Sequence, residues 1–280
     1  MLAAMGLFTA VDTLIKLTSS SLPLGEMIVL RNGIATMIIL VYARYNGGLS
    51  LPASASRTVL GWRMFAEVAS TLTFLSALVV MPIADVTGIM QFTPLALTAA
   101  AAVFLKEPVG WRRWLAAFVG LIGVLLIVPP GAGLRDPAVL LAFAAIGFVV
   151  LRDITTRKIG AEVSTLTLTA MSAISSTGAG LMLAPFETWV VPSLWNVAAM
   201  SLAAVLLLAA YAAVIIAIRT GEVAAVSPFR YSIILWALLS GYIFWGQLPD
   251  ARAALGIAVV VGAGLYTFWR ERVRKGRMGG

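Results

Sequence analysis

The sequence of 280 residues contains no cysteine and no histidine. Without cysteine the chain can form no disulfide bond, and without either residue it lacks the ordinary ligands of zinc. The missing histidine also removes the most common general base of enzymes. Most hydrolase and transferase chemistry is thereby disfavoured, so we expect no enzymatic activity, no catalytic residue, no metal and no cofactor.

Charge and nucleotide-binding motifs are scarce as well. Charged residues make up only 11% of the chain, whereas a soluble domain carries about 25%. No segment has the Gly-x-x-x-x-Gly-Lys-Ser/Thr pattern of a phosphate-binding loop, which argues against direct use of ATP. The first residues form an apolar run with no basic segment before it, so no cleavable signal peptide is predicted.

Apolar residues, in contrast, make up 61% of the chain and gather in long runs. A helix of about 20 apolar residues crosses a hydrocarbon core of about 30 Å. Proline, glycine and charged residues separate the runs, and short connections make neighbouring helices antiparallel. We therefore predict an all-α membrane protein with ten transmembrane helices, at residues 2–18, 26–43, 62–80, 84–105, 113–128, 137–155, 164–184, 195–218, 224–245 and 252–268.

The net charge of +8 comes mostly from basic residues between or after the apolar runs. With the N-terminus placed inside, fifteen of the twenty lysine and arginine residues fall in cytoplasmic segments, Arg63 and Arg152 among them, and two, Arg135 and Arg252, fall outside. Positive residues favour the cytoplasmic side, so both termini are predicted to be cytoplasmic. The charge then indicates orientation in the bilayer, and no nucleic-acid partner is expected.

The chain also shows a weak internal repeat at a shift of about half its length. The matched positions are residues 83–87 with 223–227, Phe104 with Phe244, Asp12 with Asp153 and Lys16 with Arg157. They predict a five-helix repeat at 1–130, a second at 131–270 and a basic cytoplasmic tail at 271–280. Five crossings per unit is odd, so the second unit is inverted, an arrangement that places a binding site between the halves. The alternative is that composition alone produced two similar patterns.

Several short motifs carry a resemblance to a known family. They are Ile15-Lys16-Leu17, Leu30-Arg31, Pro82-Ile83-Ala84, Leu105-Lys106-Glu107-Pro108 and the pair Gly120 and Gly123, while Gly246-Gln247-Leu248-Pro249 departs from the usual Gly-Glu-x-Pro by a glutamine. Over essentially its whole length the chain resembles the drug/metabolite transporter superfamily, in particular its ten-helix members with two EamA-type repeats. Within that superfamily it looks most similar to bacterial exporters of aromatic amino acids.

The resemblance implies a basket of ten helices around a central cavity in the bacterial inner membrane. The first, third, fourth, sixth, eighth and ninth spans would line the cavity, and the fifth and tenth would form an outer scaffold. The implied function is a secondary transporter that exports aromatic and other neutral amino acids by alternating access. The alternative is export of other small metabolites or drugs. An intramembrane enzyme is disfavoured, because no nucleophile–base pair stands out.

The span at 84–105 carries one polar stripe, made by Thr87, Gln91, Pro94 and Thr98. Their spacing places them on one helical face, which we expect to point away from lipid because unsatisfied polar groups in hydrocarbon cost several kcal/mol. Thr87 and Gln91 could bind a substrate, and Pro94 could loosen the helix for gating. The alternative is hydrogen bonding between helices.

Four ionisable residues within apolar runs are candidates for gating or coupling. Asp12 and Lys16 are one helical turn apart, so Asp12 could carry a coupling proton, although an ion pair between the two is favoured. Arg31 has the same two interpretations, with Asp12 or Glu67 as its partner. Arg230 could hold a substrate carboxylate or act in a gate, and snorkelling to the headgroups is favoured.

Aromatic and small residues complete the set of candidates. Aromatic rings on the spans expected around the cavity could stack on a substrate or attract its ammonium group, with ordinary packing as the alternative. These rings belong to Phe8, Phe74, Phe148, Tyr211 and Tyr231. Small residues such as Gly123 and Gly256 mark the spans at 113–128 and 252–268. They predict close helix packing within the bundle or a homodimer through these two spans.

Overall fold

The computed structural model describes residues 1–46, 48–51, 56–106, 110–128, 136–159, 163–220 and 227–278. This described part is built from helices and contains no β-strand. Seven helical segments are long and apolar enough to cross a membrane, and Phe229–Trp245 is a shorter apolar one. The all-helical, multi-pass architecture is thus confirmed. The number of ten crossings stays a prediction, because the helices Leu2–Thr18 and Trp111–Ile127 have only 17 residues each.

The helices follow one another along the chain with short connections. They are α1 (Leu2–Thr18), α2 (Leu24–Tyr45), α3 (Arg57–Val80), α4 (Ile83–Met90), α5 (Thr93–Phe104), α6 (Trp111–Ile127), α7 (Pro137–Ile159), α8 (Thr165–Leu183), α9 (Leu194–Thr220), α11 (Ile233–Trp245) and α12 (Ala251–Met278), with 3-10 turns η2 (Ala184–Phe186) and η3 (Ser227–Ser232).

Several helices extend beyond their predicted spans, and in α3 and α7 the extension leaves a basic residue well inside the helix. α3 begins at Arg57 rather than at residue 62, because the Ser56 hydroxyl caps its first turn. α7 continues to Ile159 rather than to residue 155. A helix does not need to end where its apolar run ends. Arg63 and Arg152 lie six and seven residues inside the ends of α3 and α7, which corrects the charge count that assigned them to cytoplasmic connections.

The predicted fourth span is divided rather than continuous. It separates into α4 and α5 at Gln91, because Pro94 at the start of α5 has no N–H to donate to the carbonyl of Met90. The Thr93 hydroxyl donates to that carbonyl instead, at 2.6 Å. The polar stripe therefore does not form a single buried face, since Thr87 is buried in α4 and Pro94 is exposed in α5.

The ninth span is broken at the corresponding place. η3 ends at Ser232 and α11 begins at Ile233, 140 residues after the start of α5. Just past the ends of α5 and α11, the backbone is left-handed at Lys106, with φ of 55°, and at Gly246, with φ of 62°. These two positions are again 140 residues apart. The two halves of the chain thus share the positions of two uncommon backbone features.

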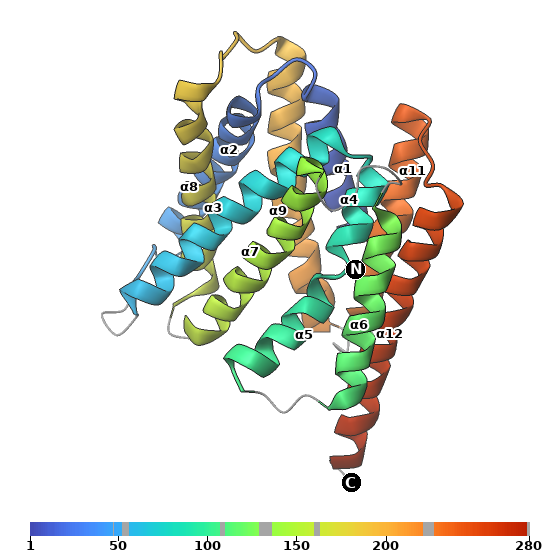
Figure 1. The fold of residues 1–280 in the computed structure, drawn as a ribbon. Helices are drawn as coiled ribbons and strands as arrows, with labels where there is room; N and C mark the ends of the chain where they lie inside the picture. The colour runs from blue at the N-terminus through green and yellow to red at the C-terminus, as the bar shows by residue number, and fades with distance from the viewer. Residues whose placement is uncertain are drawn as a thin grey trace.

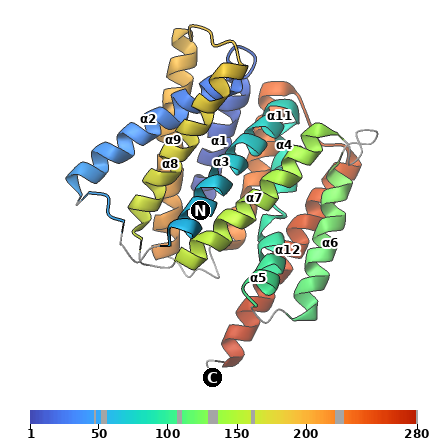
Figure 2. The same ribbon diagram turned by 60° about the vertical axis from the view of Figure 1, so that its left-hand side comes forward.

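The helices pack as pairs that each join the first half of the chain to the second half (Figure 1): α1 with α9, α2 with α8, α3 with α7 and α6 with α12. The contacts of Phe8 with Tyr211 and of Ser21 with Asn196 show that α1 and α9 are antiparallel. In Figures 1 and 2, α5 ends and α6 begins in the lower part of the bundle, whereas α11 ends and α12 begins in the upper part. These two connections therefore lie at opposite ends.

Close backbone contact holds two of these pairs together. A Cβ atom on Gly123 of α6 would lie 2.9 Å from the carbonyl oxygen of Gly256 on α12. One on Gly180 of α8 would lie 2.7 Å from the carbonyl oxygen of Gly25 on α2. Only glycine permits such an approach. The small residues of the two predicted scaffold spans therefore act in packing within the chain, and a homodimer through them stays a prediction.

Candidate functional site: a charged and aromatic cluster

Six charged side chains on four otherwise apolar helices form what we call the charged cluster. Its members are three carboxylates and three guanidinium groups: Asp12 on α1, Arg31 on α2, Arg63 and Glu67 on α3, and Arg152 and Asp153 on α7. Arg31 and Arg63 are only 9% and 7% exposed. Ionisable side chains inside membrane-spanning helices are costly and mark functional sites by default.

Glu67 is the link between the two arginines of one side of the cluster. Its Oε2 lies 3.9 Å from Arg63 Nη2 and its Oε1 lies 3.6 Å from Arg152 Nη1. Arg152 Nη2 is also 3.1 Å from Asp153 Oδ1. Arg63 reaches two further helices, because its Nε donates to Thr156 Oγ1 of α7 and its Nη1 to Ser172 Oγ of α8, each at 3.0 Å. These contacts fix α3 against α7 and α8.

The other side of the cluster is less fully paired. Arg31 Nε donates to Asn32 Oδ1 at 3.2 Å, and the Arg31 charge interacts with the carboxylate of Asp12. Asn32 Nδ2 is buried and has no hydrogen-bond partner among the described residues. The phenol of Tyr211 on α9 lies within electrostatic range of Asp12, Arg31, Glu67 and Arg152, so it connects the two sides. This side therefore keeps polar groups available to a ligand.

Aromatic rings border the charged groups on both sides. Phe8 meets Tyr211 edge to face, with ring centroids 5.3 Å apart, and Phe148 meets Phe65 in the same way at 5.8 Å. Phe65 also contacts Trp62 at 5.8 Å. Tyr211 is 49% exposed and Phe65 is 51% exposed, so the rings are not enclosed by protein. Accessible rings beside guanidinium and carboxylate groups suit a ligand with a flat ring and charged substituents.

Lys16 does not form the predicted ion pair with Asp12. Its Nζ donates to the carbonyl oxygens of Leu78 at 2.7 Å, Val79 at 3.4 Å and Met81, at the C-terminal end of α3. It also lies over the Trp245 ring, 5.8 Å from the centroid. A helix leaves its last carbonyl groups without partners and carries partial negative charge there, which explains why the ammonium is held. Lys16 therefore joins α1 to α3 and α11, away from the charged cluster.

The remaining candidate residues lie elsewhere. Phe74 is partly buried against the main apolar core, and Gln91 lies at the turn between α4 and α5. Tyr231 is buried against Phe268 of α12, with its hydroxyl without a hydrogen-bond partner in the described part of the chain. Arg230 is exposed in η3. Of the predicted candidates, the structure thus brings together Phe8, Asp12, Arg31, Phe148 and Tyr211.

Arg63, Glu67 and Arg152 were not predicted as site residues from the sequence. A usable signal was present, because Arg63 and Glu67 are one helical turn apart and so are Phe148 and Arg152. Each of these pairs lies on one helix face, and both faces meet between α3 and α7.

Comparison with known proteins gives relatives at low identity, and no family model matches the chain. The chain is 26% identical to an S-adenosylmethionine uptake transporter of Rickettsia bellii, over 94% of this chain and 90% of that protein. It is 27% identical to a riboflavin transporter of Vibrio cholerae, over 90% and 85%, and 26% identical to a pseudopaline exporter of Pseudomonas aeruginosa, over 91% and 89%. Each of these similarities covers nearly the whole chain, and each relative is a transporter of a small molecule.

A solved crystal structure of a protein has a similar fold, with a TM-score of 0.65, 20% sequence identity and coverage of 97% of this chain and 98% of that one. Together these similarities are consistent with the superfamily that the motifs resemble. The three relatives named above give no support to the finer prediction of aromatic amino acid export.

Proposed function

We propose that the chain is a secondary transporter of a small metabolite that joins a flat ring to charged groups of both signs. The observation that carries the proposal is the charged cluster, in which three carboxylates and three guanidinium groups lie beside accessible aromatic rings. The similarity to metabolite transporters supports it. Transport of a metabolite, the alternative in the sequence analysis, thus replaces aromatic amino acid export as the main hypothesis.

The chemistry of the cluster indicates how such a substrate is held. Arginine forms paired hydrogen bonds with a carboxylate, so Arg31 is the candidate for a substrate carboxylate. Asp12 attracts an ammonium or sulfonium group, and Tyr211 stacks on a ring. S-adenosylmethionine carries all of these groups, and riboflavin carries the ring. The named relatives include uptake transporters and an exporter, so the direction of transport is left to experiment.

We also propose that the two halves, 1–130 and 131–270, are inverted repeats that move by alternating access. Exchange of the halves maps the pairing of α1 with α9 onto that of α7 with α3, and it maps the pairs of α2 with α8 and α6 with α12 onto themselves. The helix breaks at residues 91 and 232 and the left-handed positions Lys106 and Gly246 support the same relation. The site would then lie between the halves, in the bacterial inner membrane with both termini cytoplasmic.

The first test is transport by the purified chain in proteoliposomes. Labelled S-adenosylmethionine is expected to enter the vesicles and to be displaced by an excess of the unlabelled compound, because the cluster matches its ring and both its charges. Methionine is expected to compete weakly, since it lacks the ring. Phenylalanine and tryptophan carry a ring and both charges, so their competition measures whether the site also accepts aromatic amino acids. Flux of phenylalanine or tryptophan without flux of S-adenosylmethionine or riboflavin would contradict the proposal, because it would restore aromatic amino acid export as the main hypothesis.

A matched pair of variants assigns the flux to the cluster. Tyr211→Ala is expected to lower the initial rate at least about tenfold, the equivalent of roughly 1.4 kcal/mol of stacking. Tyr211→Phe keeps the ring and is expected to retain most of the rate. Equal transport rates for the two variants would show that the ring of Tyr211 does not contribute to transport.

Topology is tested by single cysteines, for which a chain without native cysteine gives no background. Gln247→Cys is expected to react with a membrane-impermeant maleimide in intact cells, and Lys106→Cys only after permeabilisation. These positions follow α11 and α5, whose ends lie at opposite ends of the bundle. Labelling of both from the same side would rule out the inverted arrangement.

A further inference from the structure

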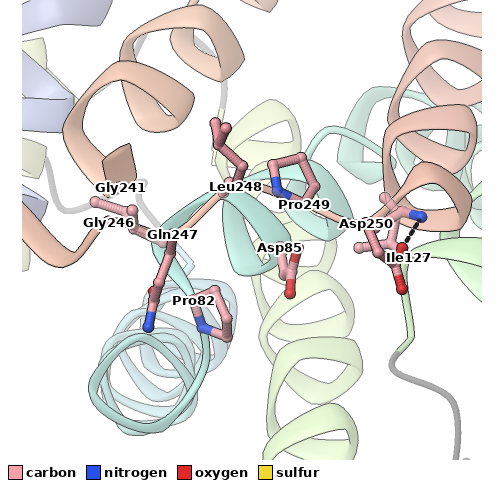
Figure 3. Close-up of a pocket in the computed structure, with 12 residues that line it drawn as sticks. Pro82, Asp85, Ile127, Gly241, Gly246, Gln247, Leu248, Pro249 and Asp250 are labelled. Carbon is pink, nitrogen blue, oxygen red and sulfur yellow. Dashed lines mark hydrogen bonds between the residues drawn. The ribbon is translucent and has the colours of Figure 1, made fainter. Parts of the chain in front are cut away.

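A separate cavity lies between the start of α4, the end of α6 and the loop that joins α11 to α12 (Figure 3). Its volume is about 310 Å³. One water molecule needs only about 10–15 Å³, so the cavity can hold a larger ligand. Gly246 sets the course of the loop, because its left-handed backbone lets the Gln247 N–H donate to Gly241 O at 3.0 Å. No residue of the charged cluster lines this cavity.

Asp85 is the unexplained residue of this cavity. Its side chain is 8% exposed, and its Oδ1 is buried without a hydrogen-bond partner among the described residues. Asp85 lies in the first turn of α4, where the helix N-terminus carries partial positive charge. That position accounts for the presence of a carboxylate but gives Oδ1 no partner. A buried oxygen of this kind is costly unless something pairs with it.

A second carboxylate, Asp250, lines the same cavity from the loop, as Figure 3 shows. Its Oδ1 accepts the Ala253 N–H at 2.6 Å and caps α12, and its charge interacts with that of Asp85. The described lining contains no lysine or arginine. Two nearby cations do not pair with these carboxylates. Lys16 Nζ donates to the end of α3, and Arg252 Nη2 donates to Leu125 O at 3.4 Å.

We propose that this cavity binds a small organic ammonium ion, held between Asp85 and Asp250 against an apolar wall. Two carboxylates without a resident cation favour a positive ligand. Ile83, Ile127 and Leu248 in the lining favour a ligand with an alkyl part. A bare metal ion is disfavoured, because the described residues contain no group of three or more acidic side chains that could hold one. This site is distinct from the proposed transport site, and binding to it is measured without transport.

The test is calorimetric titration of the purified full-length chain in detergent with n-butylammonium chloride. n-Butanol, of nearly equal size and without charge, is expected to bind at least about tenfold more weakly, a difference of roughly 1.4 kcal/mol. Equal binding of the alcohol and the ammonium ion would overturn the proposal. Displacement of the ammonium ion by an equal concentration of sodium chloride would overturn it too, since that result identifies a metal site.

Three variants locate the binding. Asp85→Asn, which keeps the shape of the side chain, is expected to weaken binding at least about tenfold. Asp250→Ser keeps a cap for α12 and removes the charge, so it is expected to weaken binding several-fold and carries the test alone if Asp85→Asn does not fold. The control is Asp136→Ser, because Asp136 Oδ1 caps α7 through Ala138 N–H at 2.8 Å outside the cavity. Unchanged binding in both cavity variants, or equal loss in the control, would contradict the assignment.

Discussion

Replacement of Glu67 by glutamine is expected to abolish transport and to lower the free energy of unfolding by about 3 to 5 kcal/mol. The physical reason is that Glu67 stands between Arg63 and Arg152, at 3.9 and 3.6 Å. The neutral amide leaves two guanidinium groups facing each other among apolar helices, with three arginines and only two carboxylates in the charged cluster. Thermal unfolding in detergent and the initial rate of uptake in proteoliposomes measure the two effects.

Two controls separate charge balance from loss of one contact. The double variant Glu67→Gln with Arg152→Gln restores equal numbers of acids and bases, so it is expected to recover much of the stability, and the double-mutant cycle gives the coupling. Asp153→Asn removes a more accessible carboxylate, 35% exposed against 14% for Glu67, and is expected to have a smaller effect. Wild-type stability and transport in Glu67→Gln would show that the ion pairs are not essential.

Replacement of Lys16 by methionine is expected to destabilise the chain by about 2 kcal/mol, because methionine has similar length but no donor for the carbonyl groups at the end of α3. It also removes the cation over the Trp245 ring. Since Lys16 joins α1, α3 and α11, its loss should loosen that end of the bundle. A cysteine introduced at Gln247 should then react faster with a maleimide.

Two control variants test whether the loss of stability comes from the contacts of Lys16. Lys16→Arg keeps the positive charge and several donors, so it is expected to lose less stability than Lys16→Met. Arg44→Met removes an exposed cation from the last turn of α2 and is expected to change the unfolding temperature little. If Lys16→Met unfolds at the wild-type temperature, the contacts of Lys16 do not stabilise the fold.

The helices could be predicted from the sequence because apolar length is a local property. α1 has the predicted bounds, and α9 extends the predicted span by one residue at its start and two at its end. The division of the fourth span follows from Pro94, whose missing N–H is also a local property. The bounds differ where polar residues continue a helix past its apolar run, as at Arg57 at the start of α3 and at residues 155–158 near the end of α7.

The choice of partners could not be predicted in this way. The spacing of Asp12 and Lys16 allowed an ion pair, but the Lys16 ammonium binds carbonyl groups of α3 that lie 62 to 65 residues further along the chain. No pattern within α1 specifies the end of α3. The charged cluster was found only in part for the same reason, since Arg152 and Glu67 meet through the packing of α3 against α7. Spacing along one helix places side chains on a face, and tertiary packing decides what that face meets.

The joint between α4 and α5 has a consequence for how the bundle can change shape. An unbroken helix resists bending because each turn is tied to the next by backbone hydrogen bonds. At this joint the Met90 carbonyl is bound by the short, rotatable hydroxyl arm of Thr93. Bending of this span is thereby confined to the single turn between the two helices, and α4 and α5 each keep their own contacts. A change of angle at this joint would therefore leave the contacts of α5 with α6 and α7, and those of α4 with α11, in place.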